Sequence, residues 1–378
     1  MKKTVFYLIF LLVVFTSCKR NKDVLHIGKD YSKTFDLVLE WDSLTIDIFN
    51  TSGIGDFFMR DSVISFADHQ YARIYNYSCN TGDLLSYHLG LGNGPNELQK
   101  FLYANTIQND TSVFIVNNNI EFFLCGNDYL LERKGLMNFG WKNRYTGEYD
   151  SPEVYNFMLT TDFGVNVYKY DDDRVIIPIQ PLIYYACENE IVTRKHYKKS
   201  HILGLLNLKT MEVDSVFGRY PKYYHEHLLP HIDYFSYLYS NNELIVSFAV
   251  DSLIYVYEYP DKLLYTFGYE CKDIVRDYTE SSRLTNDLYK DFIKTGISTE
   301  ILNFPETGFF FRTYIKNMQN TSFGMQIYNR SYDLLADVEV PKYFKLLGYF
   351  DSCYYGITFV PEETDENTYI TIYKIKIL

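Results

Sequence analysis

The sequence predicts an all-β protein, specifically a six-bladed β-propeller closed by its N-terminal and C-terminal strands. Two observations carry this prediction: a high aromatic content and a hairpin unit that recurs along the chain. The 378 residues include 38 tyrosines and 28 phenylalanines. These residues favour strands, because a flat ring packs well on a pleated, half-buried surface. Alanine-rich helical periodicity is nearly absent.

The clearest hairpin unit occupies residues 73–98. Strands around 74–77 and 84–87 are joined by a polar turn at 80–83, whose small residues tolerate positive φ. Weaker copies follow, and their matched strands centre near Phe122, Leu206, Val256, Ile327 and Ile372. Counted from Ile74, the spacings are about 48, 84, 50, 71 and 45 residues. A period of 45 to 50 residues with two insertions is typical of propeller blades.

A further apolar run precedes each hairpin and predicts a third strand in each unit. These runs lie at 62–66, 112–116, 175–177, 244–248, 309–311 and 354–360. The last strand, 369–377, has no partner after it, and an unpaired outer edge invites aggregation. We therefore expect segment 35–49 to pair with it and close the last sheet. The alternative is a β-sandwich, which also needs many short strands but does not require one unit to recur at one spacing.

The N-terminus has the pattern of an export signal. Lys2 and Lys3 precede an apolar run at 5–15, which is shorter than the roughly 20 residues that a membrane-spanning helix needs. Thr16, Ser17 and Cys18 resemble the lipobox of bacterial lipoproteins, in which the cysteine is acylated; the alternative is an ordinary cleaved signal. The predicted organisation is a signal peptide at 1–17, an acylated Cys18 with a flexible tether at 18–30, and a propeller domain at 31–378. This predicts anchoring in the bacterial cell envelope, on the periplasmic side or at the cell surface.

Charge and cysteine content limit the partners and the covalent chemistry. Removing Lys2 and Lys3 takes the formal net charge from −12 to −14, and an acidic surface repels nucleic acid. Five cysteines follow Cys18, and no two form a CxxC motif. We expect most of them to be reduced and buried, with one disulfide as the alternative. They are Cys79, Cys125, Cys187, Cys271 and Cys353.

A glycine-rich loop follows the first hairpin. Gly90, Gly92 and Gly94 permit backbone conformations that other residues avoid, Pro95 follows them, and Glu97 is expected to cap nearby amides. The loop is flanked by strands and lacks a P-loop lysine, so it predicts a structural connection between blades rather than a phosphate site. It resembles the G-x-G-x-G-P-x-E loop of six-bladed, NHL-like propellers in envelope lipoproteins of uncharacterised function. The resemblance implies a fold and a lipoprotein context, and it supplies no catalytic residue.

The candidate ligand site is the segment 220–239, which is rich in histidine and tyrosine. Three interpretations remain open: an ordinary loop with surface histidines, a metal site with His225 and His227 on one face of a strand, or a surface whose tyrosines stack on a sugar or a peptide. The candidate residues are Tyr223, Tyr224, His225, Glu226, His227, His231, Asp233 and Tyr234.

Long insertions interrupt the repeat and are expected to lie on one face, where such excursions often carry binding. One spans 136–159, and another spans 186–200 and contains a basic run at 194–199. A helix is expected around Leu284, Leu288 and Phe292, which recur at helical spacing. The acidic segments 171–174 and 362–367 are expected to be hairpin turns, although the first has a composition that also suits calcium.

The function that best fits these features is a non-catalytic binding or scaffold module, expected to be monomeric, that recognises a protein or glycan partner. No catalytic motif of recognisable spacing occurs. We therefore predict no catalytic residue, no metal and no cofactor. The alternative is an envelope enzyme that processes polysaccharide with carboxylates at the propeller channel.

Overall fold

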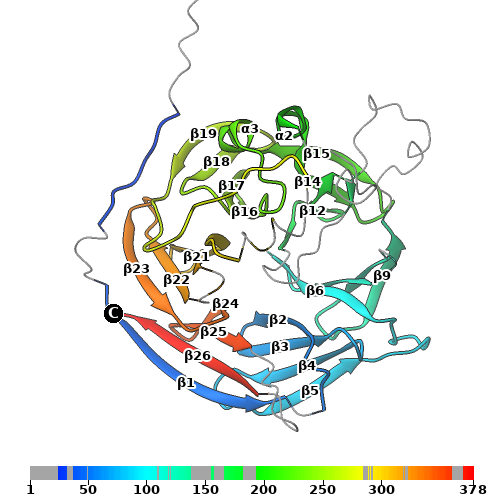
Figure 1. Ribbon diagram of the computed structural model, residues 1–378. Helices are drawn as coiled ribbons and strands as arrows, with labels where there is room; N and C mark the ends of the chain where they lie inside the picture. The colour runs from blue at the N-terminus through cyan, green and yellow to red at the C-terminus, as the bar shows by residue number, and fades with distance from the viewer. Residues whose placement is uncertain are drawn as a thin grey trace, which may run out of the picture.

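The computed structural model describes residues 24–31, 37–48, 50–108, 110–117, 119, 121–137, 155–156, 166–181, 193–283, 288, 290, 293–317, 319, 322–359 and 369–378. These residues form an all-β fold, as predicted, and Figure 1 shows its sheets following one another around the middle of the molecule. Six predictions lie wholly or mostly outside the described residues: the signal peptide at 1–17, Cys18, the insertion at 136–159, Cys187, the helix around Leu288 and the acidic turn at 362–367.

The strands form six groups of four, and neighbours within each group pair antiparallel. The first group is β2 (Gly55–Arg60), β3 (Val63–Asp68), β4 (Arg73–Ser78) and β5 (Leu84–Leu89). The second is β6 (Phe101–Gln108), β7 (Val113–Asn117), β8 (Glu121–Cys125) and β9 (Leu131–Leu136). The third is β11 (Val167–Lys169), β12 (Arg174–Pro178), β14 (His201–Asn207) and β15 (Val213–Arg219). A parallel pairing of β6 with β11 joins the second and third groups into one eight-stranded sheet.

The remaining groups repeat the arrangement. The fourth is β16 (Phe235–Ser240), β17 (Glu243–Phe248), β18 (Ile254–Glu258) and β19 (Lys262–Phe267). The fifth is β20 (Ile297–Phe304), β21 (Phe309–Asn317), β22 (Ser322–Tyr328) and β23 (Leu334–Val340). The sixth is β24 (Phe344–Phe350), β25 (Cys353–Phe359), β26 (Tyr369–Ile377) and β1 (Leu39–Asp47). A separate short pair joins β10 (Tyr155–Asn156) to β13 (Gln180–Pro181).

The two ends of the chain meet in the sixth group, as expected from the spare strand at 35–49. Strand β1 pairs antiparallel with β26 from Leu39 opposite Ile377 to Asp47 opposite Tyr369. Ile46, which lies opposite Ile370, is buried in a cluster that also contains Phe66 of the first group. The N-terminal strand therefore joins the last sheet to the first through a shared core.

The segment before β1 lies along the outer edges of two further groups. The amide of Ile27 donates to the carbonyl of Thr266 in β19 at 2.8 Å, and the amide of Leu334 in β23 donates to the carbonyl of Lys29 at 2.8 Å. Figure 1 shows this stretch, in blue, on the outside of the molecule. These hydrogen bonds hold this segment against the two sheets, and the role of residues 18–30 as a tether stays a prediction.

Four of the five predicted cysteines are described, and all four are buried free thiols, in agreement with the reduced state expected for them: Cys79, Cys125, Cys271 and Cys353. Burial raises the pKa of Cys125 to about 12, so this thiol is inert toward oxidation and metal binding. In the described part of the chain, no helix has the length and apolar character needed to cross a bilayer.

Candidate functional site

The predicted ligand segment, 220–239, packs between the third and fourth groups. Helix α3 (Lys222–Glu226) occupies its start and β16 its end. The expectation that His225 and His227 share one face of a strand is therefore wrong, because His225 lies in the helix and His227 is its C-cap residue.

The eight predicted residues fall into a buried group and an exposed group. Tyr224, His231 and Asp233 are buried. The ring of Tyr224 packs against Tyr197, with ring centroids 5.3 Å apart, and its hydroxyl donates to the carbonyl of Ile232 at 2.8 Å. Tyr224 is thus a core residue, and its ring is closed to a ligand.

The other five predicted residues are partly or fully exposed: Tyr223, His225, Glu226, His227 and Tyr234. Nδ1 of His227 lies 2.7 Å from Glu280 Oε1, and this hydrogen bond holds the pKa of Glu280 below its usual range. Among the described residues, no three His, Cys, Asp or Glu side chains gather as a metal site. Stacking of a ligand on Tyr223 and Tyr234 stays a prediction.

The glycine-rich loop connects β5 to β6, and its geometry explains one of its glycines. The amide of Gly94 donates to Glu97 Oε2 at 2.8 Å, so Glu97 caps the loop. A Cβ at Gly92 would lie 2.0 Å from the same oxygen. None of Gly90, Gly92 and Gly94 has a positive φ. The expected need for unusual backbone angles is therefore wrong, and a side chain at position 92 would instead displace the Glu97 carboxylate from its cap.

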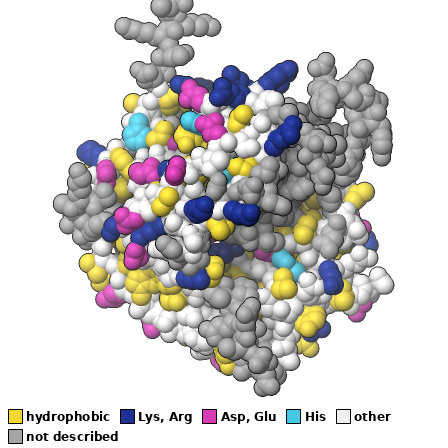
Figure 2. Space-filling model, in the orientation of Figure 1, with side chains coloured by type: hydrophobic (Ala, Val, Ile, Leu, Met, Phe, Trp, Pro, Cys, Tyr) yellow, Lys and Arg dark blue, Asp and Glu magenta, His cyan; other side chains and the backbone are white. Residues whose placement is uncertain are grey.

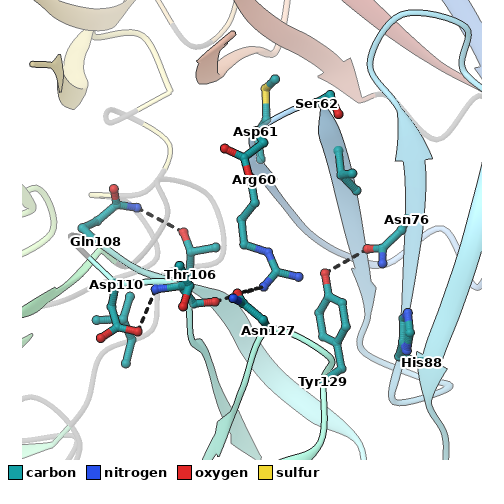
Figure 3. A pocket seen from close by; sticks show the side chains of 14 residues that line it. Arg60, Asp61, Ser62, Asn76, His88, Thr106, Gln108, Asp110, Asn127 and Tyr129 are labelled. Carbon is teal, nitrogen blue, oxygen red and sulfur yellow. Dashed lines mark hydrogen bonds between the residues drawn. The ribbon is translucent and has the colours of Figure 1, made fainter. Parts of the chain in front are cut away.

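A polar cleft of about 590 Å³ opens where the turns of the first and second groups meet (Figure 3). It is built from the β2–β3 turn of the first group and the β6–β7 and β8–β9 turns of the second, with side chains of β4 and β5 at one side. Its polar lining includes Arg60, Asp61, Asn76, His88, Gln108 and Asn127. This volume lies within the usual range for small-molecule sites.

Arg60 is the cation of this cleft, and neighbours on the second group hold it in place. Its Nη1 donates to the carbonyl of Thr111 at 3.0 Å and to Oδ1 of Asn127 at 3.3 Å. Its guanidinium carbon lies 4.5 Å from the centre of the Tyr129 ring, a cation–π distance. Nε and Nη2 of Arg60 donate to no described residue, so both remain free for a ligand in the cleft.

Tyr129 supports Arg60 as a rigid platform. Its ring lies between Arg60 and His88, and the His88 ring stacks on it at 4.6 Å. Its hydroxyl donates to Asn76 Oδ1 at 2.9 Å and lies 3.1 Å from Ser65 Oγ. These contacts hold Tyr129 at φ +61°, a left-handed conformation that costs a non-glycine residue about 1–3 kcal/mol.

The charges of the cleft are set by burial and by neighbouring groups. Burial, followed by the charge of Arg60, lowers the pKa of His88, so this imidazole is neutral at pH 7. Burial alone would raise the pKa of Asp110. Hydrogen bonds from Lys169, 2.9 Å away, and from Ser112 outweigh it and lower that pKa to about 2. Asp110 therefore lines the cleft as a carboxylate, and the charge of Lys169 balances its negative charge.

This arrangement suits binding better than nucleophilic catalysis. Guanidinium, amide and carboxylate groups offer donors and acceptors in fixed planes, which match the adjacent hydroxyls of a sugar. The histidine that lines the cleft places Nε2 3.0 Å from Ser86 Oγ in its own strand, and Ser86 does not line the cleft. The described lining thus lacks a paired nucleophile and base.

Sequence reasoning did not find the cleft, because its side chains come from turns that belong to two different units. Each turn taken alone has the Asn- and Asp-rich composition of an ordinary hairpin. Aligning the repeats places the 60–63 turn beside the 126–130 turn of the next unit. The proximity of these two turns was the sequence signal that could have revealed the cleft.

Outside the cleft, Glu300 of β20 is a buried carboxyl with an altered pKa. Burial raises its pKa, and the charge of Lys345 opposes this only in part. A raised pKa in the folded state gives stability that is fully present below the unfolded pKa of about 4.3 and is lost as pH rises through the folded pKa. We therefore expect Glu300→Gln to raise the free energy of unfolding at pH 8 by about 1–3 kcal/mol and to leave it unchanged at pH 4.

Urea denaturation at the two pH values measures this difference, with Glu306→Gln at an exposed turn as the matched control. A Glu300→Gln variant less stable than the parent chain at pH 8 would show that the carboxylate is satisfied in the fold.

Comparisons with known proteins agree on the fold. No family model matches the chain, and no curated protein matches it. A member of the DUF4221 family from Bacteroides vulgatus ATCC 8482 superposes with a TM-score of 0.65 at 12% identity, over 91% of this chain and 99% of that one. A protein described as exported, from Bacteroides fragilis NCTC 9343, superposes with a TM-score of 0.52 at 11% identity, over 93% and 99%. The chain therefore shares its all-β architecture with these two Bacteroides proteins along nearly its whole length.

Proposed function

We propose that this chain is a lipid-anchored six-bladed β-propeller of the bacterial cell envelope and acts as a non-catalytic module that binds a small glycan. Each four-stranded group is one blade, and β1 closes the ring as the outer strand of the last blade. The order of the six groups along the chain and the pairing of β1 with β26 support this architecture. The pairing also gives the sixth group four strands, as in each of the other five groups.

The envelope location rests on the N-terminus. The lipobox-like residues before Cys18 support acylation, and a polar stretch of five residues links Cys18 to Val24 on the folded body. The structural neighbour from Bacteroides fragilis, described as exported, supports transport out of the cytoplasm. Two or more acyl chains make a stable anchor, since each buried CH₂ contributes about 0.8 kcal/mol.

The observation that carries the binding function is the guanidinium of Arg60, which lies on Tyr129, lines a cleft of about 590 Å³ and has two nitrogen donors that bond no described residue. The volume favours a glycan fragment of one or two sugars over a protein surface. Asp61 and Gln108 add acceptors and donors around the same space. No observation on the described residues favours the polysaccharide-processing alternative over binding.

Isothermal titration tests this function on the full-length protein in detergent. The probes are chitobiose, maltose and glucuronic acid, which represent acetamido, neutral and acidic sugars. We expect saturable binding of at least one probe. Arg60→Met, which keeps the chain length over Tyr129 but removes the donors, is expected to weaken that binding at least ten-fold, or about 1.4 kcal/mol.

The matched control is Lys209→Met, at an exposed turn of the third group. It is expected to bind like the parent chain. Saturable binding that Arg60→Met leaves unchanged would move the site elsewhere, and the absence of binding to all three probes would refute a glycan site of this kind.

A further inference from the structure

A patch of six exposed cations lies around helix α2 (Arg194–Lys199) and helix α3. We call it the cationic rim, and it consists of Arg194, Lys195, Lys198, Lys199, Arg219 and Lys222. Figure 2 shows Lys and Arg side chains gathered at this edge of the molecule. The chain as a whole carries a formal charge of −12, so a cluster of positive charge contrasts with the rest of it.

Helix α2 directs its cations outward because its other side is anchored. Thr193 caps the helix, and His196 and Tyr197 are its buried residues. The Tyr197 ring packs on Tyr220 and Tyr224, with centroids 5.0 and 5.3 Å away. None of the four cations of α2 forms an ion pair with a described residue.

The flanking residues keep the rim positive. Arg219 donates to the carbonyl of Lys199 at 3.1 Å, so its guanidinium is held against α2. Lys222 forms an exposed pair with Glu226 at 3.2 Å, and Glu280 bonds His227 nearby. The six cations of the rim outnumber these described acids together with Asp261, which accepts from the amide of Gly218.

The N-terminal segment brings the lipid anchor to the same place. Val24 and His26 share a cavity of about 460 Å³ with Pro221 and Lys222. The fixed part of the chain therefore begins beside α3. Residues 18–23 span at most about 20 Å when fully extended. An acylated Cys18 thus keeps the membrane surface within about 20 Å of Val24.

We infer that the cationic rim lies on the anionic lipid head groups of the membrane that holds Cys18 and so orients the protein on that membrane. The inference rests on the lipid anchor of the proposed function. A single lysine or arginine near an anionic surface contributes about 1 kcal/mol. The anionic membrane repels the rest of the acidic protein surface. The cationic rim therefore determines which side of the protein faces the membrane.

This orientation turns the polar cleft away from the membrane. The cleft is built from turns between the first and second and between the third and fourth strands of its groups. Helix α2 lies in the connection between the second and third described strands of its group, and α3 lies between two groups. In antiparallel sheets these two sets of connections lie at opposite ends of the strands.

The test uses the full-length lipidated protein in vesicles of phosphatidylcholine with 30% phosphatidylglycerol. An environment-sensitive fluorophore is attached by maleimide to Arg194→Cys or, as the distal position, to Lys209→Cys; the parent chain gives the labelling background. Head-group nitroxide lipid quenches a probe near the surface. We expect at least two-fold more quenching at 194 than at 209, and an equal, low value at both positions in 1 M NaCl, where screening is strong.

Charge reversal tests whether the cations of the rim cause the excess quenching at position 194. The variant Lys195→Glu/Lys198→Glu/Lys199→Glu, made with the probe at 194, is expected to abolish the excess quenching. The matched control, Lys209→Glu/Lys262→Glu/Arg330→Glu, changes the net charge equally at exposed residues that do not belong to the rim and is expected to keep the excess quenching.

Equal quenching at 194 and 209 in vesicles that carry the protein, or loss of the excess in the matched control, would overturn the inference and leave the anchor intact. Failure of the parent chain to float with the vesicles, as Cys18→Ala is expected to fail, would overturn the anchor itself.

Discussion

Replacing Arg312 by methionine is expected to lower the free energy of unfolding by about 3–5 kcal/mol. The guanidinium of Arg312 in β21 is fully buried. It donates to the carbonyls of Ser252, at 2.7 Å, and of Tyr269, and to Oε1 of Gln326 at 2.6 and 3.0 Å. Ser252 and Tyr269 belong to connections of the fourth group, so this one side chain ties the fourth group to the fifth.

The cost is large because a buried carboxylate depends on the same network. Gln326 Nε2 donates to Asp337 Oδ2 at 2.9 Å, and the Tyr314 hydroxyl donates to Oδ1 at 2.5 Å. Without the guanidinium, Gln326 Oε1 and the carbonyls of Ser252 and Tyr269 lose their donors, and the Gln326 amide that donates to Asp337 is no longer fixed.

Urea denaturation measures the Arg312→Met effect, with Arg330→Met as the matched control. Arg330 lies on an exposed turn of the same group, and its replacement should change stability by less than about 0.5 kcal/mol. A loss below about 1 kcal/mol for Arg312→Met would mean that the network adds little to the fold.

Replacing Ile46 by aspartate is expected to cost at least about 4 kcal/mol and to prevent folding at 37 °C. Ile46 of β1 is buried against residues of both the first and the sixth groups. An unpaired carboxylate there would separate the two sheets that the N-terminal strand joins. The change therefore acts on the closure of the ring rather than on one sheet.

Thr45→Asp is the matched control, because Thr45 is the preceding residue of the same strand and faces solvent. It receives the same new side chain, and the expected loss is below about 1 kcal/mol. Thermal unfolding followed by circular dichroism compares the two variants. Equal melting temperatures for Ile46→Asp and the parent chain would show that β1 does not close the structure.

The hairpins were predictable from sequence because their signals are local. The third and fourth strands of a group are joined by short polar turns, and residues such as Asn80 and Gly82 mark these turns directly. The partner of β26 was also predictable. One end of the chain has a strand without a partner and the other end has an additional strand-forming segment, so the two are expected to pair.

The first strand of each group was not predicted. Most of them follow long connections, so no short hairpin turn marks where they begin. β11 has only three residues, and β16 begins inside the aromatic segment 220–239 that was interpreted as a ligand site. A strand with little alternation between polar and apolar residues also lacks the period that identifies a half-buried strand.

The aromatic segment 220–239 shows why the candidate site could not be read from composition. Tyr224 has the residue type of a sugar-stacking platform, yet its ring supports Tyr197 of α2 in the core. Core packing and ligand stacking use the same side chains. The cleft residues, by contrast, are common turn residues, and their role depends on Arg60 and Asn127 of different groups meeting in space.

The most direct test of the binding function is a crystal structure of the protein soaked with the sugar that binds best in the titrations. The proposed function predicts a sugar ring in the cleft, with hydroxyl or carboxylate oxygens within 3.2 Å of Nε or Nη2 of Arg60. A sugar bound instead at Tyr223 and Tyr234, or ordered elsewhere with the cleft unoccupied, would contradict it.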